Sequence, residues 1–199
     1  MNVSSPNIIV SPKREIFLIS DTHFNHNNII KYCDRPFKEA DEMNWFMVER
    51  WNSLIKPQDK VYHLGDVYMG GGFTREYTDN LLSKLNGHKR LILGNHDNGR
   101  DQLLHKFFEK IDMWRHFKDF GLLLTHVPVH PSSLERFDGV PDAEKRSWKV
   151  NKTPSHLMKN IHGHTHTNAE PHGDTKNYKC VCVELTDYKP VNIEELRIK

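Results

Sequence analysis

The sequence predicts an α/β protein in which strands and helices alternate. In the first half of the chain, short apolar runs typical of buried strands are separated by segments with helical periodicity. From residue 111 onward strand-like segments dominate, and several apolar runs end directly in residues that bind metals or transfer protons. Because such side chains meet at the carboxyl edge of an α/β sheet, the pattern predicts a layered domain with a functional site at that edge.

The first half of the chain contains the clearest elements. Strands are expected at residues 15–20, 61–64 and 90–93. Helices are expected at residues 28–33, 41–55, 73–85 and 102–110. In the second of these helices, Met47 and Trp51 belong to a set of apolar residues at helical spacing, which predicts one buried face. Asp101, directly before the last helix, is suited to cap its amino end.

The second half is expected to be rich in strands. Alternating residues over 113–118, followed by Gly121 and the apolar run 122–125, predict a hairpin. Thr153-Pro154 is suited to the start of a helix. The chain closes with a predicted strand at residues 179–185 and a short segment at residues 191–196.

A long segment without regular periodicity covers residues 127–153. It carries several prolines and a basic cluster with one aromatic residue at 145–149. A loop of this length inside a compact domain is usually functional or disordered. We therefore expect residues 127–153 to form the rim of an active site.

Composition sets the broad class of protein. A chain of 199 residues fits a single domain, residues 1–199, and a net charge of +2 does not indicate a dedicated nucleic-acid binder. The three cysteines, Cys33, Cys180 and Cys182, do not form a disulfide framework and fit a reducing compartment. The amino terminus lacks the features of a signal peptide, and no apolar run is long enough to span a membrane. These observations predict a soluble, cytoplasmic protein.

Metal-capable side chains follow five apolar runs. They are Asp21 with His23, Asp66, Asn95 with His96, His126, and His164 with His166. Within each pair two residues apart, an extended backbone directs both side chains to one face. Two such faces opposite one another can hold two ions. Carboxylate, imidazole and amide oxygen ligands together suit Mn, Fe, Zn or Co better than Ca or Mg.

These motifs resemble those of the calcineurin-like metallophosphoesterase superfamily. The matching segments, in the family's order, are Asp21-Thr22-His23, Gly65-Asp66, Gly94-Asn95-His96-Asp97, His126 at a strand end, and Gly163-His164-Thr165-His166. The resemblance spans most of the chain. It implies a four-layer αββα sandwich with two mixed β-sheets and no separate capping domain.

The resemblance also implies a role for each of these residues. Asp21, His23, Asp66 and His166 would bind a first metal. Asp66 would bridge to a second metal bound by Asn95, His126 and His164. His96 would lie beside the substrate, where it stabilises charged phosphoryl oxygens or protonates the leaving alkoxide. The implied cofactors are two divalent transition-metal ions, Mn first, with Fe, Zn, Co or Ni as alternatives.

Some assignments stay open at this stage. Val67-Tyr68-Met69 follows Gly65-Asp66 where the protein-phosphatase branch has a second aspartate and an arginine, which argues against a Ser/Thr protein phosphatase. His130 remains an alternative to His126 as a ligand. Asp97 either orients His96 or caps the turn. His26, Arg35 and Asp97 are the candidates for substrate contacts at the mouth of the site.

The expected function is hydrolysis of phosphomonoesters or phosphodiesters, including nucleotides or cyclic nucleotides, by a metal-bound hydroxide. The expected partner is therefore a phosphate-ester substrate, with no membrane partner. One alternative is a nuclease, which the basic cluster at residues 145–149 would serve. The other is a metal-binding scaffold of the same fold that has lost catalysis. Substrate and oligomeric state are not readable from the sequence.

Overall fold

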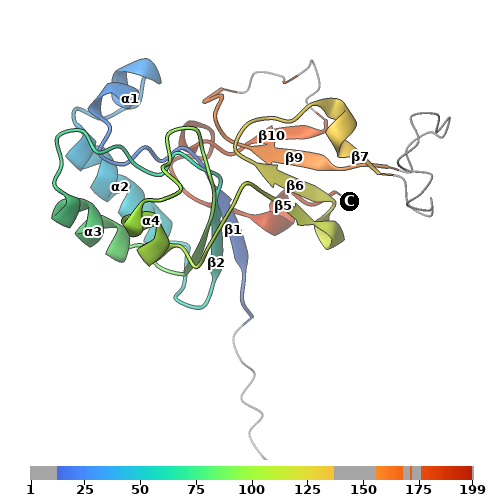
Figure 1. Cartoon of the computed structure of the whole chain (residues 1–199), viewed down its shortest axis with the longest axis horizontal. Coiled ribbons are helices and arrows are strands. Elements are labelled where there is room, and N and C mark those ends of the chain that lie inside the picture. The colour runs from blue at the N-terminus through green and yellow to red at the C-terminus, as the bar shows by residue number, and fades with distance from the viewer. Residues whose placement is uncertain (1–12, 137–155, 168–170, 172–175, 199) are drawn as a thin grey trace, which may run out of the picture.

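The structure is a computed structural model that describes residues 13–136, 156–167, 171 and 176–198 (Figure 1). The expected helix start at Thr153-Pro154 and the basic cluster at 145–149 lie outside the described residues. Where the description resumes, β8 (His156–Leu157) and β9 (Lys159–His162) are strands, so the helix expected to follow Pro154 does not extend into residues 156–162.

A five-stranded sheet forms the first half of the fold. Its order is β11 (Val191–Asn192), β1 (Ile16–Ile19), β2 (Lys60–His63), β3 (His88–Ile92) and β4 (Lys110–Asp112). β1 to β4 run parallel to one another, whereas β11 is antiparallel to β1. Since β1, β2 and β3 are parallel neighbours, their carboxyl ends meet at one edge of the sheet.

A four-stranded sheet forms the second half. Its order is β10 (Tyr178–Cys180), β9, β6 (Leu122–Thr125) and β5 (Trp114–Phe117). β5 and β6 form the expected antiparallel hairpin, which turns through the 3-10 helix η1 (Lys118–Phe120) and Gly121 at φ +67°. β10, β9 and β6 are parallel to one another. A short strand pair, β7 (Glu135–Arg136) with β8, extends from this sheet.

The four α-helices of the described residues pack on one face of the first sheet (Figure 1). They are α1 (Asn27–Tyr32), α2 (Ala40–Asn52), α3 (Arg75–Ser83) and α4 (Gln102–Phe107). Asp101 caps α4 as expected, since its side chain accepts a hydrogen bond from the amide of Leu103. Alternation along β1 explains the layers: Phe17 and Ile19 pack with the helices, whereas Leu18 packs between the sheets.

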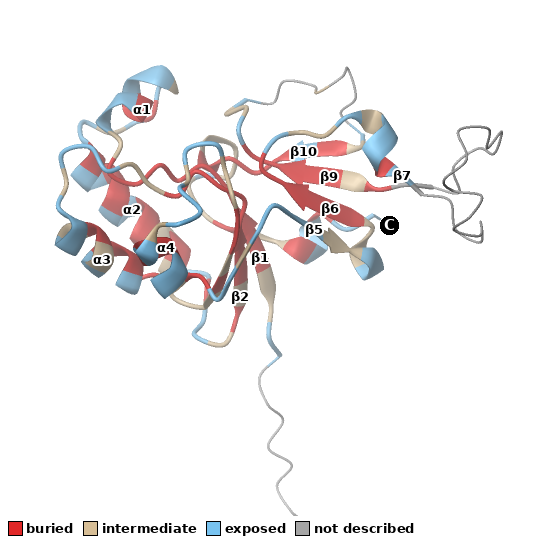
Figure 2. Ribbon diagram, in the orientation of Figure 1, coloured by how far each residue is buried: buried red, intermediate tan, exposed pale blue. Residues whose placement is uncertain are grey.

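The space between the two sheets is a second apolar core. Leu18, Tyr62 and Ile92 of the first sheet meet Leu122, Leu124 and Ile161 of the second. Burial is accordingly concentrated in the strands and on the inward sides of the helices (Figure 2). The α/β class with two mixed sheets, predicted from the sequence, is confirmed.

The outer face of the second sheet is covered differently from the first. Leu123 of β6 packs there against Leu134 and Met158. Leu134 belongs to the 3-10 helix η2 (Pro131–Leu134), and among the described residues this element forms the fourth layer. No helix in the described parts of the chain has the length and apolar character needed to cross a membrane.

The closing segment is shorter in regular structure than expected. Only β10 of the expected strand at 179–185 is a regular strand, and it is followed by the 3-10 helix η4 (Val183–Leu185). The intervening chain leaves β9 and pairs with the end of β1, through a bridge between Ser20 and Cys182. This crossing joins the two sheets directly beneath the predicted metal ligands. After β11, the 3-10 helix η5 (Ile193–Glu195) is the last regular element among the described residues.

Candidate metal centre and active site

The side chains predicted from the strand ends lie around one site. Asp21 and His23 follow β1, Asp66 follows β2, and Asn95 and His96 follow β3. His126 follows β6, and His164 and His166 follow β9. The two sheets therefore each contribute about half of the site, and the site lies where their carboxyl edges meet.

One group of potential ligand atoms comes from Asp21, His23 and His166. Their ligand atoms all lie within 4.8 Å of one another. The Nε2 atom of His166 lies 3.3 Å from Oδ1 of Asp21, and Nε2 of His23 lies 3.8 Å from the same oxygen. Asp21 and His23 are buried, so protein atoms surround these two ligands of the group.

A second group comes from Asp66, His126 and His164, whose ligand atoms meet the same 4.8 Å limit. Asn95 adds a neutral oxygen to this group. Its Oδ1 lies 2.8 Å from Nε2 of His126 and 2.9 Å from Nδ1 of His164. The set therefore has the mixed carboxylate, imidazole and amide character expected of a transition-metal site.

Asp66 lies between the two groups. Its Oδ2 atom is 3.6 Å from Nε2 of His23 and 3.4 Å from Nε2 of His126. Its Oδ1 atom accepts a hydrogen bond of 2.9 Å from the amide of His96, which fixes the carboxylate plane. One carboxylate thus touches both groups of potential ligands.

The unpaired atoms of the site test whether it fits a cation. Oδ1 of Asp21 and both ring nitrogens of His23 are buried and have no hydrogen-bond partner among the described residues. Buried polar atoms are nearly always hydrogen-bonded, and an exception calls for an explanation such as an ion. Burial lowers the pKa of His23 to about 3, so its ring is the neutral form that binds metals. These residues fit a divalent cation.

The rest of the Asp21 carboxylate is already engaged. Its Oδ2 atom accepts hydrogen bonds from the hydroxyl of Ser20, from the amide of His164 at 2.9 Å and from the thiol of Cys182 at 3.1 Å. Burial alone would raise the pKa of Asp21, but the nearby rings of His166 and His126 and the hydroxyl of Ser20 hold this pKa well below its usual value. Only Oδ1 remains for a ligand.

Two histidines have ring orientations fixed by partners outside the site. Nδ1 of His126 donates to the carbonyl of Leu64 at 2.7 Å, and Nδ1 of His166 donates to Oε1 of Glu184 at 2.9 Å. Each leaves Nε2 to face the carboxylates. A metal-binding histidine is commonly held in this way by its other nitrogen. His130, the alternative to His126, is exposed and caps η2 through its own side chain, away from these groups.

Arg35 lies beneath the site and not at its mouth, where the sequence analysis expected it. The side chain is only 3 % exposed. Its five N–H donors reach the carbonyls of Asp21 and Thr22, the sulfur of Met43, and Oε1 of Glu184 twice. No donor is left for a substrate, so Arg35 supports the turn that carries Asp21 and His23.

Asp97 has an equally local role. Its carboxylate accepts hydrogen bonds from the amides of Asp66 at 2.9 Å, Val67 at 2.9 Å and Gly94 at 2.8 Å. These bonds join the loop after β2 to the loop after β3. Of the two roles left open for Asp97, the geometry favours the capping of this turn. Asp97 was also a candidate for a substrate contact, but its carboxylate oxygens face these backbone amides.

His96 and His26 lie at the open side of the first group. The ring centroid of His96 is 5.6 Å from that of His23, and the ring of His26 is 5.4 Å from it. His96 is exposed and belongs to neither group of ligand atoms, whereas His26 is half-buried. Burial, and then the charge of His96, lower the pKa of His26.

The backbone at the site is unusual. Five of the predicted ligands have positive φ: Asp21 at 57°, His23 at 46°, Asp66 at 57°, His164 at 68° and His166 at 51°. Non-glycine residues rarely adopt this left-handed conformation, which costs free energy and occurs most often at functional sites. The glycines of the motifs are required because there is no space for a side chain at their positions. A side chain at Gly94 would overlap the carboxylate of Asp66, and one at Gly163 would overlap that of Asp21.

Sequence reasoning missed the supports of the ligands. Glu184, Ser20 and Cys182 touch Asp21 or His166, yet none of them belongs to a motif that the sequence reveals. A single carboxylate inside the apolar run 179–185 was the one available sign for Glu184. Burying it is unfavourable unless a charged partner is present.

Comparison with known proteins identifies the family. The family model described as calcineurin-like phosphoesterase matches residues 15–190, which include every predicted ligand. The chain belongs to the calcineurin-like phosphoesterase family. The resemblance seen in the motifs is thereby confirmed, and the chain is a metal-dependent phosphoesterase of a family that typically binds divalent metals.

Three proteins similar to this chain have names that give no substrate. An uncharacterized protein of Methanocaldococcus jannaschii is 37% identical over 185 residues, covering 91% of this chain and 88% of its own length. The gene 66 protein of Mycobacterium phage D29 is 31% identical over 172 residues, covering 76% of this chain and 78% of its own. The crystal structure of a protein of unknown function from Aquifex aeolicus superposes with a TM-score of 0.67 at 28% identity, over 92% of this chain and 98% of that one.

Proposed function

We propose that this phosphoesterase uses two divalent metals to hydrolyse phosphomonoester or phosphodiester bonds. The observation that carries the proposal is the position of Asp66, whose Oδ2 lies 3.6 Å from His23 and 3.4 Å from His126. A single carboxylate between two groups of ligands is the arrangement that a two-metal site needs. The first ion would be held by Asp21, His23, Asp66 and His166. The second would be held by Asp66, Asn95, His126 and His164.

When bound, two divalent ions would lower the pKa of a water molecule and neutralise charge on the phosphoryl oxygens. The protein's own residues supply the rest. Hydrogen bonds donated to the carbonyl of Leu64 and to the carboxylate of Glu184 hold the rings of His126 and His166 in one orientation, so little reorganisation is needed. His96, exposed beside His23, is placed to donate a proton to the departing alkoxide or to a phosphoryl oxygen.

The donor set also favours a class of metal. Four imidazoles, two carboxylates and one amide oxygen suit Mn, Fe, Zn, Co or Ni better than Mg or Ca, and we place Mn first. Metal binding would also displace protons. In the metal-free protein, the nearby carboxylates of Asp21 and Glu184 outweigh the effect of burial and raise the pKa of His166 to about 9.

One panel of measurements tests the proposed function. Metal-stripped protein is supplied in turn with Mn, Fe, Zn, Co, Ni or Mg. The bound metal is counted by mass spectrometry, and turnover is measured on a phosphomonoester, a phosphodiester, and 2′,3′- and 3′,5′-cyclic nucleotides. We expect two ions per chain and turnover with at least one metal. An Asp66→Ala variant should lose bound metal and turnover together, and full activity in that variant would rule the mechanism out.

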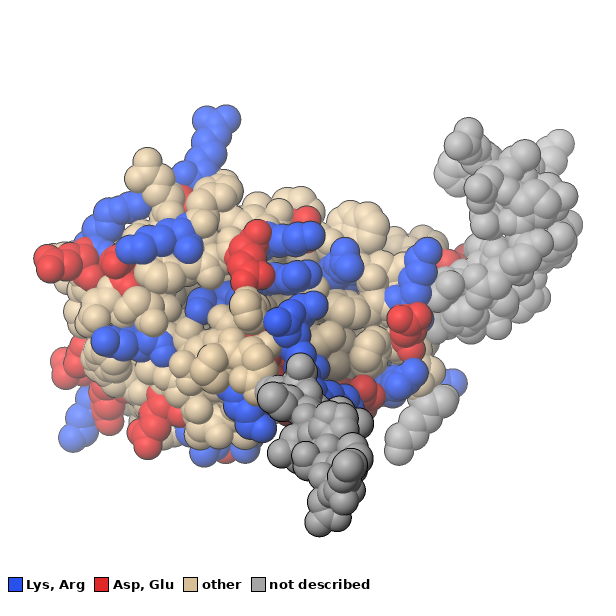
Figure 3. All heavy atoms as spheres, turned by 90° about the horizontal axis from the view of Figure 1, so that it is seen from below, with Lys and Arg blue, Asp and Glu red and all other residues tan. Residues whose placement is uncertain are grey.

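A nuclease is the less favoured alternative. Among the described residues, positive charge gathers around Lys60. The charges of Arg14, Arg90 and Arg115 repel its ammonium group. Figure 3 shows the molecule from below the view of Figure 1. Lys and Arg side chains lie over the middle of this face, with Asp and Glu side chains among them. Lys60 opens β2 at its amino end, and the ligands lie at the opposite ends of the strands. Salt-dependent binding of DNA or RNA would favour the nuclease.

A scaffold without catalysis is the second alternative. The chain carries all seven predicted ligands together with His96, and the described geometry brings them to one site. A protein that had lost catalysis would have no need to keep an exposed imidazole next to the ligands. Absence of turnover with every metal, combined with stoichiometric metal binding, would favour the scaffold.

A further inference from the structure

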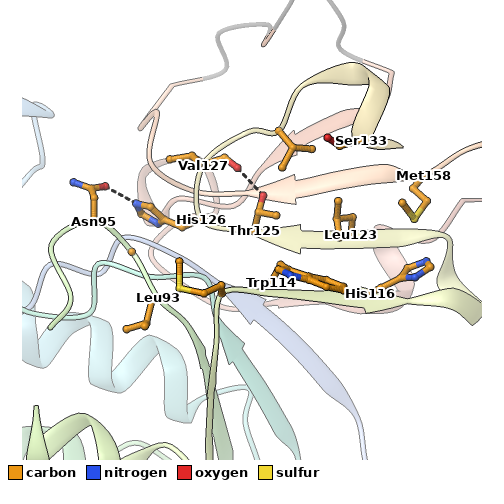
Figure 4. A pocket seen from close by; sticks show the side chains of 13 residues that line it. Leu93, Asn95, Trp114, His116, Leu123, Thr125, His126, Val127, Ser133 and Met158 are labelled. Atoms are coloured by element: carbon orange, nitrogen blue, oxygen red, sulfur yellow. Dashed lines mark hydrogen bonds between the residues drawn. The ribbon is translucent and has the colours of Figure 1, made fainter. Parts of the chain in front are cut away.

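We propose that the cavity next to Asn95 and His126 binds the organic group of the phosphoester, and that this group is uncharged, apolar and flat. The inference rests on the proposed function and specifies its substrate class. The cavity has a volume of about 730 Å³ and begins at the second group of ligands (Figure 4). A ligand whose phosphoryl group meets the metal ligands would therefore extend its organic group into the cavity.

The hairpin of β5 and β6 builds the floor of this cavity. Trp114 pairs with Thr125 and His116 pairs with Leu123, so these four side chains share one face of the second sheet. The alternate residues Phe117, Leu122 and Leu124 point to the other face and pack in the core between the sheets. The cavity thus occupies the outer face of the sheet, the face that carries only η2 as a helical layer among the described residues.

The floor continues without a break to the metal ligands. His126 directly follows Thr125 at the end of β6, and Asn95 lies opposite it, hydrogen-bonded to its ring (Figure 4). Leu93 and Gly94, just before Asn95, complete this end of the cavity. The strands that deliver the ligands therefore also deliver the apolar lining, and the two sites share His126 and Asn95.

The lining is largely apolar, and its titratable side chains among the described residues are those of His116 and His126. Among the described residues that line the cavity there is no Lys, Arg, Asp or Glu. The hydroxyl of Thr125 is already used, since it donates to the carbonyl of Val127 at 2.6 Å and accepts from the side-chain amide of Asn160 at 2.9 Å. A charged organic group would lose its hydration here without meeting a Lys, Arg, Asp or Glu side chain among the described lining residues. The ligand is therefore uncharged beyond its phosphate.

Exposed apolar side chains indicate the shape of the ligand. Trp114 is 60 % exposed, Met113 67 % and Val127 46 %. Contiguous apolar surface of this kind commonly marks a binding site. An exposed indole presents a flat face on which an aromatic ring can stack. The volume falls within the range of small-molecule sites and is large enough for a fused ring system. An aryl phosphoester is the class that fits.

Paired substrates test the cavity separately from the metal site. 1-Naphthyl phosphate carries a flat apolar group, whereas glycerol 3-phosphate carries a small polar one. We expect Trp114→Ala to lower kcat/KM for 1-naphthyl phosphate roughly tenfold, mainly through KM, and to leave the value for glycerol 3-phosphate within about twofold. Val127→Asp, which adds a negative charge, should act in the same direction. Trp45→Ala, at a partly exposed tryptophan on α2, is the matched control.

A second measurement does not depend on metal or turnover. 1-Naphthol is added to metal-stripped protein while the indole N–H resonances are recorded, with Trp114 assigned by its loss in Trp114→Ala. We expect the Trp114 resonance to shift in a saturable manner and those of Trp45 and Trp51 to stay in place. Equal changes in kcat/KM for both esters, or no shift of Trp114, would overturn the inference. A clear shift, combined with no turnover of either ester or of any substrate in the metal panel, would support the cavity and reject the proposed function.

Discussion

Nδ1 of His166 donates a hydrogen bond to Oε1 of Glu184 at 2.9 Å. The same oxygen accepts a hydrogen bond from Nε of Arg35 at 2.8 Å. Glu184 thus connects a predicted metal ligand to the buried arginine that holds the turn after β1. Arg35 in turn donates to the carbonyls of Asp21 and Thr22. One carboxylate thereby fixes the turn after β1 of the first sheet relative to the turn after β9 of the second sheet.

Replacing Glu184 should weaken metal binding without removing a ligand. Glu184→Gln keeps the size of the side chain but loses the charge that orients His166, and we expect affinity for the first metal to fall roughly 10- to 100-fold. Calorimetric titration of metal-stripped protein with Mn measures this change. Glu194→Gln, at an exposed glutamate in η5, should leave affinity unchanged. Equal affinities in Glu184→Gln and the unaltered protein would refute the positioning role.

His96 should separate catalysis from metal binding. Its side chain is exposed and lies outside both groups of ligand atoms. In His96→Ala we expect turnover to fall by roughly 10²- to 10⁴-fold, while the number of bound ions stays the same. Steady-state kinetics and metal analysis on the same preparation test this. His105→Ala, at an exposed histidine in α4, serves as the control, and a loss of metal in His96→Ala would reassign His96 as a ligand.

Replacing Asp97 should lower the stability of the protein and not its affinity for substrate. Its carboxylate accepts three backbone hydrogen bonds, from Asp66, Val67 and Gly94. Removing it leaves those amides without their partner, and we expect Asp97→Ala to lower the free energy of unfolding by roughly 3 kcal/mol. Urea unfolding of metal-stripped protein measures the loss, with Asn98→Ala as the neighbouring control. A raised KM at unchanged stability would instead return Asp97 to the substrate-binding residues.

His63 should make the metal-free protein sensitive to acid. The ring is buried, with Nε2 2.9 Å from the hydroxyl of Thr22, and burial lowers its pKa to about 4. The unfolded chain protonates this ring near pH 6.5, so the neutral folded form loses stability as pH falls from 6.5 towards 4. The loss is about 3 kcal/mol at most.

Urea unfolding between pH 7 and 4 tests this sign. His63→Gln, which does not titrate, should show a smaller decrease in the free energy of unfolding over that range than the unaltered protein. His105→Gln, at an exposed position, should keep the full decrease. Parallel curves for His63→Gln and the unaltered protein would show that His63 does not contribute.

The sequence was informative wherever local pattern determines structure. Apolar runs that end in Asp66 or Asn95 predicted both the strand and the polar group at its end, because burial and the turn are properties of neighbouring residues. β4 was missed because Lys110 and Asp112 are exposed and only Ile111 carries an apolar side chain, so its pairing with β3 supplies what the pattern lacks.

Long-range partners could not be predicted from the sequence. Arg35 lies in the loop after α1 and Glu184 lies in η4, far apart along the chain, and neither occurs in a motif. Arg35 was expected at the mouth because it lies soon after His23, but its place depends on the largely buried carboxylate of Glu184. The cavity depends on the same kind of information. Alternation at Trp114 predicted a strand, yet only the register with β6 shows which face lies beside His126.

Five predicted ligands hold left-handed backbone conformations. Glycine would adopt those conformations at lower energetic cost, but it could not bind an ion. Random mutation and selection for thermal resistance alone would therefore tend to replace these residues and erode the site. Selection for catalysis must act continuously against that drift. Heat-resistant variants obtained without an activity screen are expected to carry changes at these five positions, and their increased stability would measure what the site costs the fold.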